Sequence, residues 1–348
     1  MKKNFLLIFV SLFIVVVVME IFLRFFLPQE LTSPFRVIGK DGLVLNIKND
    51  NAVHFFKKRR TTYKFGEYHN RIYDFKEKEK KILVLGDSFT FGWLLNDEDT
   101  YIYKLNKNFN DYFFINAAAG GWGASDHLKY LIEFCNIIKP NFIIIFINGG
   151  DISRSKRSNL FYLDKDNKIQ PGQNITYSVE KFTENFLYKI AIENSHLLNF
   201  LRKELSRYVY NKKKDSSKII KLDKINDKVK ITKEINKNSI KSENFVFEKK
   251  LFLKIKEEVK KCNSQLILIN LGWGDYNVDI DSHFFKEIFK EKNFFDDNSI
   301  KFIDLINEME FIRNNRQQFM IKVEGHPNEF ANEIIYKLVS NKIKNLID

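Results

Sequence analysis

The residues of this sequence best suited to chemistry are a serine and a histidine that lie far apart along the chain. Ser88 follows the apolar run Ile82–Leu85 in the segment KILVLGDSFTFG, and His326 lies in the segment EGHPN. A serine hydroxyl becomes a nucleophile when a base removes its proton, and histidine suits this role because its pKa lies near neutral pH. Glu324, two residues before His326, can hold the imidazole in the required tautomer. These three residues predict acyl transfer through a serine nucleophile.

Acyl transfer also requires hydrogen-bond donors for the negative charge that develops on the carbonyl oxygen. Two further turns of small residues, GGWG and NGGD, can supply such donors. The candidates for this oxyanion hole are the N–H groups of Ser88, Gly121 and Gly150 and the side-chain amide of Asn148. Each residue also has an ordinary structural interpretation, because glycines form turns, asparagine forms Asx turns and a histidine before a proline can cap a helix. The loops point to catalysis only when they are taken together.

Three apolar runs predict the strands that would bring these loops together. Ile82–Leu85, Tyr112–Asn116 and Phe142–Ile147 are short, and they are followed by the turns GDS, AAAGGWG and NGGD. Such runs are typical of strands buried on both faces of a parallel sheet. The carboxyl ends of parallel strands share one edge, which is where α/β folds bind their ligands. We therefore predict an α/β fold, a three-layer α/β/α sandwich with a parallel sheet, in which a closing helix over Asn328–Ile347 carries EGHPN to that edge.

The rest of the chain alternates between predicted helices and strands. Helices are expected over Thr100–Asn108, Asp126–Ile138, Lys181–Tyr210, Phe247–Lys261 and Ser282–Lys292, and strands over Gln265–Leu271 and Ile300–Leu305. We divide this part of the chain into an approach segment at 28–80 and a catalytic domain at 81–348. A Lys-rich stretch at about 205–245 is interpreted as a solvated insertion. In the approach segment, Arg71 and Asp74 can pair in a turn that we expect to be solvated.

An apolar N-terminal segment predicts a membrane anchor at 1–27. Two lysines precede the run Phe5–Phe26, which is long enough to cross a bilayer as a helix. A cleavable signal peptide is the alternative, but its apolar core would be shorter, and no A-x-A-like cleavage site follows. The lysines place the N-terminus in the cytoplasm and the bulk of the chain outside it, although Arg24 weakens this orientation. Glu20 either is costly within the membrane or marks the end of the span.

Composition argues against several other classes of function. The net charge of +13 comes from lysines spread along the chain while arginine is scarce, which disfavours nucleic-acid binding. Cys135 and Cys262 are widely spaced, and they predict two buried thiols in place of a disulfide or a metal site. The histidines outside EGHPN have no metal-ligand spacing, and His127 is expected to be a packing or surface residue. We expect no metal and no cofactor.

The four loops resemble those of the SGNH (GDSL-type) hydrolases, particularly the membrane-anchored bacterial members with a GDSFTFG block and a closing D-G-H-P-N block. The resemblance covers roughly residues 81–151 and 247–347. It implies that Ser88 is the nucleophile and His326 the base, and that the N–H of Gly121 binds the oxyanion. In the family, an asparagine of the third block also donates to the oxyanion.

The sequence departs from the family pattern in two of the four blocks. Where the family has Asn-Asp, this chain has Gly150-Asp151, and the nearest asparagine is Asn148, two residues earlier. Either Asn148 reaches the oxyanion by a local rearrangement, or the oxyanion hole has one donor fewer, which typically costs about a hundredfold or more in rate. Glu324 stands where the family has aspartate, and its longer side chain can still reach the imidazole.

The expected activity is that of a serine esterase acting on ester bonds. The resemblance and the anchor together suggest O-acyl groups of an exported or cell-envelope glycan as the substrate. Four residues in or beside the loops are candidates for the substrate cleft: Asp87, Trp93, Trp122 and Asp151. For the two tryptophans, packing in the core is an equally good interpretation. The catalytic domain is expected on the extracytoplasmic side of a bacterial inner membrane, and the sequence indicates no particular oligomeric state.

Three alternatives to hydrolysis remain at this point. The same site can serve an O-acyltransferase that passes the acyl group to a polysaccharide hydroxyl. The missing asparagine of the third block instead favours a non-catalytic envelope-binding protein on a degenerate scaffold. Finally, the lysines of Lys212–Glu243 could hold anionic lipids or an acidic polysaccharide, which would make the chain a membrane-surface module.

Overall fold

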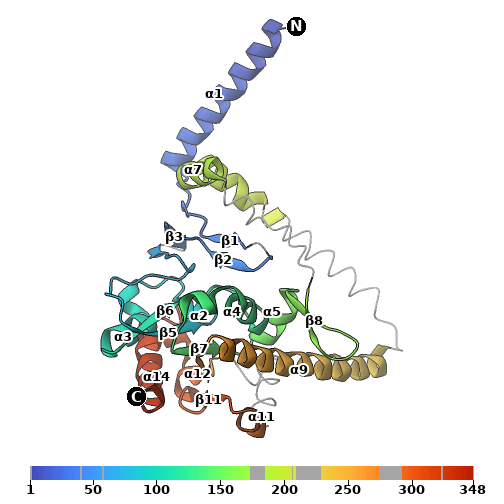
Figure 1. Ribbon diagram of the computed structural model, residues 1–348. Coiled ribbons are helices and arrows are strands. Elements are labelled where there is room, and N and C mark those ends of the chain that lie inside the picture. The colour runs from blue at the N-terminus through green and yellow to red at the C-terminus, as the bar shows by residue number, and fades with distance from the viewer. Residues whose placement is uncertain are drawn as a thin grey trace. The chain divides into compact units, whose positions relative to one another are not determined.

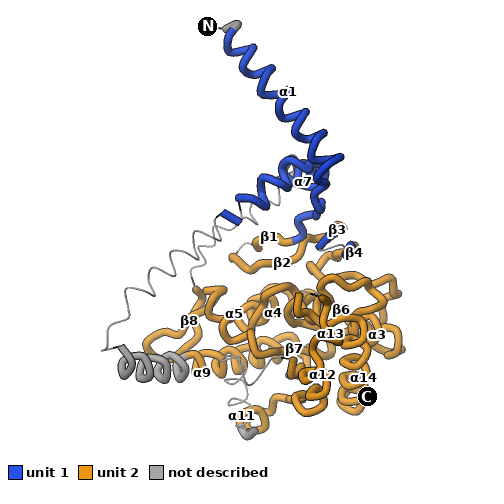
Figure 2. The backbone as a smooth tube through the Cα atoms, turned by 180° about the vertical axis from the view of Figure 1, so that it is seen from behind, with its two compact units in different colours: residues 1–35, 52–61, 179–238 blue, residues 36–51, 62–178, 239–348 orange. Residues whose placement is uncertain are grey.

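The computed structural model describes residues 2–39, 41–56, 59–172, 185–205, 207–208, 229–273, 292–322 and 324–347. The chain forms two compact units, which are coloured separately in Figure 2. One unit comprises residues 1–35, 52–61 and 179–238, and the other comprises 36–51, 62–178 and 239–348. Much of the Lys-rich insertion and nearly all of the predicted helix Ser282–Lys292 lie outside the described residues. The boundaries that we predicted for the anchor, the approach segment and the catalytic domain stay a prediction.

The larger unit is built on a five-stranded sheet in which neighbouring strands are parallel. Its order is β11-β10-β7-β5-β6, with β5 at Lys80–Leu85, β6 at Tyr112–Asn116, β7 at Phe142–Ile147, β10 at Gln265–Asn270 and β11 at Lys301–Asp304. The first strand of this sheet along the chain, β5, therefore lies between β6 and β7, and the chain order reverses there. Such a reversal opens a crevice at the carboxyl edge of the strands, where α/β folds bind ligands. The predicted parallel sheet is confirmed.

Helices cover both faces of this sheet and produce the predicted three layers (Figure 1). The core on one face joins the sheet to α4 (Ala124–Ile138), α5 (Asp151–Arg157), α9 (Val229–Lys261) and α11 (Lys292–Asp297). The core on the other face joins it to α3 (Tyr101–Asn108), α12 (Glu310–Asn314) and α14 (Glu329–Ile347). The strand residues alternate between these two cores, as Leu83 does with Ile82 and Val84.

Short elements complete the fold. They are β1 (Arg36–Ile38), β2 (Val44–Asn46), β3 (Asn51–Phe56), β4 (Arg59–Lys64), α2 (Ser88–Phe91), a 3₁₀ helix (Asp97–Asp99), β8 (Phe161–Leu163), β9 (Ile169–Pro171) and α13 (Arg316–Phe319). β1 pairs with β2 and β8 with β9, each pair antiparallel. β1–β4 all lie in the approach segment.

The two cysteines form a disulfide, so the prediction of two thiols is wrong, although their burial was predicted correctly. Cys135 lies in α4 and Cys262 directly follows α9, and their Cα atoms are 6.0 Å apart across a sequence separation of 127 residues. The two helices pack on the same face of the sheet, and this packing brings the side chains together. Disulfides persist mainly outside the reducing cytosol.

The smaller unit contains α1 (Lys2–Phe26) and α7 (Phe186–Asn194), and α7 is followed by a helix at 196–205. Among the described residues, α1 is the one helix that is long and apolar enough to cross a membrane, over Asn4–Phe26. Its large apolar side chains are almost all exposed. This agrees with the predicted anchor, and a signal sequence would meet the same criteria.

Candidate active site

Ser88 lies in the turn that follows β5, at the point where the strand order reverses. It is the first residue of α2. The turn is tight, because a Cβ atom at Gly86 would lie 2.2 Å from Oγ1 of Thr90. Only glycine, which has no Cβ atom, avoids this clash. Asp87 caps α2 by accepting a 2.9 Å hydrogen bond from the N–H of Phe89 to its Oδ1. The segment GDS therefore presents Ser88 at the carboxyl edge of the sheet.

His326 lies next to Ser88, and Glu324 lies beside the other nitrogen of its imidazole. Nε2 of His326 lies 2.9 Å from Oγ of Ser88, and Oε2 of Glu324 lies 3.3 Å from Nδ1 of the same imidazole. The structure therefore brings together the predicted nucleophile, base and carboxylate. With Nδ1–H facing the carboxylate, Nε2 is left as the acceptor for the serine proton.

The loop before α14 fixes the backbone of His326. The N–H of Ile321 donates to the carbonyl of His326 at 2.8 Å, and the N–H of Asn328 donates to the carbonyl of Phe319 at 2.9 Å. These two hydrogen bonds close a short antiparallel loop around EGHPN. The loop places the imidazole over the edge of the sheet, as predicted from its position before the last helix.

Two aromatic rings flank the imidazole. The ring centroids of Phe89 and Trp93 lie 5.2 Å and 6.0 Å from that of His326. Trp93 is therefore at the site, as one of its two interpretations predicted. Burial lowers the pKa of His326 below its ordinary value of 6.5, while the carboxylates of Asp87 and Glu324 act in the opposite direction. At neutral pH the imidazole is neutral and can accept a proton.

The GGWG turn lies next to Ser88. A Cβ atom at Gly120 would be 3.8 Å from Cβ of Ser88, and the N–H of Ala119 donates to the carbonyl of Gly86 at 3.2 Å. Gly121 has φ +80°, which favours glycine. Within the described part of the chain, the backbone N–H groups of Ser88 and Gly121 make no hydrogen bond, so both can donate to an incoming oxyanion.

Trp122 belongs to the core and not to a cleft. It is buried, and its indole N–H donates to the carbonyl of Val44 at 2.7 Å. Its interpretation as a core residue was the correct one. His127 packs against it with a ring-centroid distance of 5.8 Å, and burial lowers the pKa of His127 to about 3. His127 is therefore a neutral packing residue.

The third loop uses its side chains internally. Nδ2 of Asn148 donates to Oδ2 of Asp87 at 2.7 Å, and its Oδ1 accepts a 3.1 Å hydrogen bond from the N–H of Gly150. Asn148 thus forms an Asx turn that is tied to the nucleophile turn. The N–H of Gly150 is bound to this oxygen, so it is not free for an oxyanion. The N–H of Gly150 is therefore engaged, and one of the two N–H groups of the Asn148 amide is held by Asp87.

Arg154 joins the third loop to the nucleophile turn, and the sequence analysis missed it. Its Nη1 lies 2.5 Å from Oδ2 of Asp87 and 3.1 Å from Oδ1 of Asp151. Both carboxylates are buried, so Asp87 and Asp151 do not line a cleft as predicted. A Cβ atom at Gly150 would lie 3.2 Å from Cζ of Arg154, so the guanidinium occupies the space beside this glycine. The spacing of Asp151 and Arg154 on one helix turn was the available signal.

Arg71 supports the segment after α2, and the prediction of a solvated turn there is wrong. Its guanidinium is buried and donates to three carbonyl oxygens, those of Phe91, Gly92 and Leu95. It also pairs with Asp97 at 2.8 Å, whereas Asp74 pairs with Lys64. Arg71 thus satisfies backbone groups that a glycine-ended short helix leaves unpaired.

The assembled site can support nucleophilic catalysis. It offers a hydroxyl with a base in hydrogen-bond contact, a carboxylate behind the base and two unengaged backbone donors. The residues that the structure describes contain no group of three or more His, Cys, Asp or Glu side chains that could hold a metal ion.

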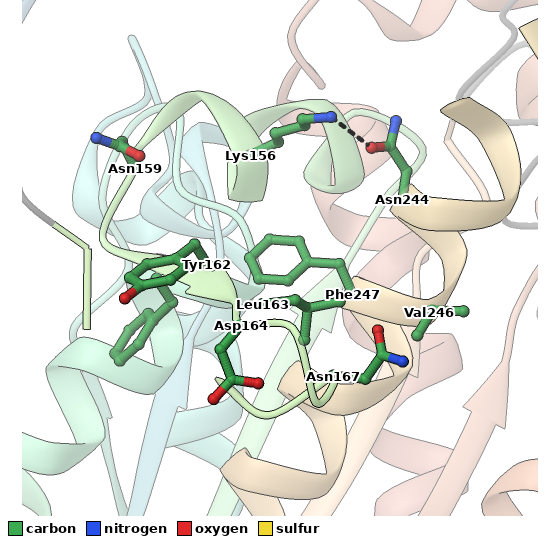
Figure 3. A pocket seen from close by; sticks show the side chains of 10 residues that line it. Lys156, Asn159, Tyr162, Leu163, Asp164, Asn167, Asn244, Val246 and Phe247 are labelled. Carbon is green, nitrogen blue, oxygen red and sulfur yellow. Dashed lines mark hydrogen bonds between the residues drawn. The ribbon is translucent and has the colours of Figure 1, made fainter. Parts of the chain in front are cut away.

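A separate cavity of about 630 Å³ lies between α5, the β8–β9 hairpin and the start of the described side chains of α9 (Figure 3). Its walls combine aromatic residues, such as Tyr162 and Phe247, with polar ones. Lys156 and Asn244 close one side through a 3.1 Å hydrogen bond. Neither Ser88 nor any residue that touches it lines this cavity.

Comparison with known proteins finds similarity at the level of structure. No family model and no curated protein matches the sequence. Similar solved structures include "TesA" (12% identity, TM-score 0.45), covering 77% of this chain and 100% of that one. They also include the esterase EstA from Pseudoalteromonas sp., with 13% identity and a TM-score of 0.44 over 77% of this chain and 99% of that one. A member of the lipolytic protein G-D-S-L family from Veillonella parvula has 12% identity and a TM-score of 0.42 over 76% of this chain and 98% of that one.

Proposed function

We propose that this chain is a serine esterase that hydrolyses ester bonds through Ser88, His326 and Glu324. The proposal is carried by the 2.9 Å distance between Oγ of Ser88 and Nε2 of His326, with a carboxylate on the far side of the imidazole. A general base must lie within hydrogen-bond reach of the proton that it removes, and this pair meets the condition. Burial of the imidazole supports the same role, because it favours the neutral form.

In the proposed reaction, Oγ of Ser88 attacks the carbonyl carbon of the ester while Nε2 of His326 takes the hydroxyl proton. Glu324 stabilises the imidazolium, and the N–H groups of Ser88 and Gly121 bind the oxyanion. The tetrahedral intermediate then expels the alcohol, which receives the proton from His326, and the acyl group stays on Ser88. Water attacks this acyl-enzyme by the same route and releases the acid and the free serine.

We further propose that α1 holds the enzyme in a bacterial inner membrane, with the larger unit on the extracytoplasmic side. The lysine pair at the N-terminus and the Cys135–Cys262 disulfide both support this orientation. From there the enzyme would reach O-acyl groups of an exported or cell-envelope glycan. The acyl group would pass to water, or to a sugar hydroxyl in an O-acyltransferase.

The third loop favours a second candidate function, a non-catalytic envelope-binding protein on the same scaffold. One N–H of the Asn148 amide is held by Asp87, and Gly150 has no side chain to offer where the family has an asparagine, so the side-chain donor expected at that position is missing. Loss of a side-chain donor costs about a hundredfold or more in rate. Under this second hypothesis, Ser88 would not react with an activated electrophile.

Labelling with a fluorophosphonate probe separates the two candidates. The full-length chain in detergent is compared with Ser88→Ala, with His326→Ala and with Ser158→Ala, a control that removes a hydroxyl at the end of α5. We expect labelling of the wild type and of the control, and none of the other two variants. A folded wild-type protein that takes no label would favour the binding scaffold.

A further inference from the structure

The helix at 196–205 is attached to α1 through the carboxylate of Glu20. This carboxylate accepts hydrogen bonds from Oγ of Ser195 at 2.9 Å and from the N–H groups of His196 and Leu197 at 3.0 Å and 2.8 Å. The first N–H groups of a helix have no partner within the helix, so they need acceptors from elsewhere. Glu20 therefore caps this helix from within α1.

Further hydrogen bonds reinforce the attachment. Nη2 of Arg24 donates to the carbonyl of Asn194 at 2.9 Å and to Oε1 of Glu20 at 3.1 Å. The N–H of Gln29 donates to Nδ1 of His196 at 2.8 Å. Figure 1 shows α7 beside the end of α1 that is distant from the N-terminus. The helix pair, α7 and the helix at 196–205, is thus fixed at one level along α1.

That level is set by the length of α1. The part of the candidate span before Glu20 runs from Asn4 to Met19, which at 1.5 Å per residue is about 24 Å of helix. The hydrocarbon core of a bilayer is about 30 Å thick. If α1 spans the membrane from Asn4, Glu20 lies close to the far boundary of the hydrocarbon, and so does the helix pair that it caps.

The helix pair carries exposed apolar side chains at this level. Leu201 and Leu205, one helical turn apart on the same face, are 53% and 64% exposed. On α7, Leu187 and Ile190 are also exposed, Leu187 to 73%. The pair is nevertheless packed internally, since Ile192 is fully buried. Large apolar side chains on a packed pair of helices therefore face outward at the boundary of the membrane.

We propose that the helix pair lies in the interface of the bilayer that α1 crosses, with Leu201 and Leu205 in contact with lipid acyl chains. The proposal rests on α1 being a membrane tether. A lipid surface is the partner because Glu20 holds the start of the helix with the exposed leucines against the apolar helix α1, near the end of the candidate span. Interfacial helices bury such a face about 5–10 Å below the headgroups. This second attachment would fix the tilt and rotation of α1.

Quenching by spin-labelled lipid tests the proposal on the full-length chain in nanodiscs of phosphatidylcholine and phosphatidylglycerol. An NBD label is attached to a single added cysteine in Leu201→Cys or Leu205→Cys, while the native cysteines stay in their disulfide. Lys203→Cys is the matched control, because two residues turn a helix by about 200° and place this exposed side chain opposite the leucines. Val16→Cys reports on α1 itself.

We expect labels at 201 and 205 to be quenched about threefold more than the label at 203, with emission shifted to the blue. Equal, weak quenching at all three positions together with strong quenching at 16 would overturn the proposal and leave the tether intact. Weak quenching at 16 as well would overturn the tether on which the proposal rests. Neither result bears on the reactivity of Ser88, which the fluorophosphonate probe measures separately.

Discussion

The two sides of Ser88 are built in different ways. On one side, Nε2 of His326 lies 2.9 Å from Oγ of Ser88, and a carboxylate oxygen of Glu324 lies 3.3 Å from Nδ1 of the same imidazole. On the other side, where the oxyanion would form, one N–H of the Asn148 amide is held by Asp87, and Gly150 stands where a side-chain donor was expected. The unengaged donors beside Ser88 are backbone N–H groups.

This difference follows from the chemistry of the two tasks. Proton transfer needs one titratable side chain at hydrogen-bond distance, so the residue types on that side are constrained. An oxyanion accepts a hydrogen bond from any N–H at the right distance, so a side-chain donor can be lost while backbone donors remain. In this chain the third loop supports the nucleophile turn instead, because Asn148 and Arg154 both bind Asp87, which precedes Ser88.

Ser88→Ala gives the largest expected effect on activity, because it removes the hydroxyl from which His326 takes the proton. We expect the hydrolysis of an activated aryl ester to fall by about 10⁴-fold or more in kcat, because Ser88 is the nucleophile in contact with His326 among the residues that the structure describes. Steady-state hydrolysis of p-nitrophenyl acetate by the full-length chain measures this loss, with Ser158→Ala as the control. If Ser88→Ala kept its activity, the reaction would have to take place elsewhere on the chain.

Arg154→Met tests the side of Ser88 that is formed by the third loop. Here we expect the substitution to lower the stability of the protein. The substitution leaves Asp87 and Asp151 buried together without their cation, which costs about 3 kcal/mol of unfolding free energy at neutral pH. Burial raises the pKa of Asp151 well above its ordinary value, so protonation relieves the repulsion and the loss shrinks as the pH falls.

Chemical denaturation of the full-length variant in detergent, followed by near-UV circular dichroism, measures this loss. Arg157→Met, an exposed arginine on the same helix, is the matched control and should leave the midpoint unchanged. An unchanged midpoint for Arg154→Met would mean that Asn148 and the backbone suffice to hold Asp87.

The sheet could be predicted from the sequence because each strand is marked locally. Tyr112–Asn116 and Phe142–Ile147 match β6 and β7 residue for residue, since the first run is apolar up to Asn116, the second is apolar throughout, and both are followed by turns of small residues. The same logic predicted the position of Ser88, because the carboxyl edge of a parallel sheet gathers the loops that follow its strands, whereas His326 was placed there by the closing helix that follows it.

The features that escaped prediction depend on contacts between distant residues. Cys135 and Cys262 pair only because α4 and α9 pack on one face of the sheet, which no local pattern records. Arg71 is buried because carbonyl groups after α2 surround it, and Arg154 because two carboxylates converge on it. From sequence alone, a charged residue is expected at the surface, because the groups that pair with it in the interior are identified only when the fold is known.

Glu324→Gln sharpens the comparison within the proton-transfer side. The amide keeps the shape of the carboxylate but cannot stabilise the imidazolium, so we expect kcat/KM to fall by about a hundredfold with little change in KM. This is a smaller loss than for Ser88→Ala, because the oxygen lies 3.3 Å from Nδ1 in a partly exposed position. Glu324→Asp, which keeps the charge, should retain more activity than Glu324→Gln. The opposite order would assign Glu324 a purely structural role.

The pH dependence of kcat/KM gives the smallest effect and reports on His326 directly. Only the neutral imidazole can take the serine proton, so kcat/KM should rise about tenfold per pH unit below the pKa of His326 and level off above it. Burial lowers this pKa below 6.5, so the midpoint should lie on the acid side of an ordinary histidine. The carboxylates of Asp87 and Glu324 raise the pKa, and Glu324→Gln should therefore move the midpoint to still lower pH. A shift of the midpoint to higher pH would contradict the assignment of Glu324 as the carboxylate that faces the imidazolium.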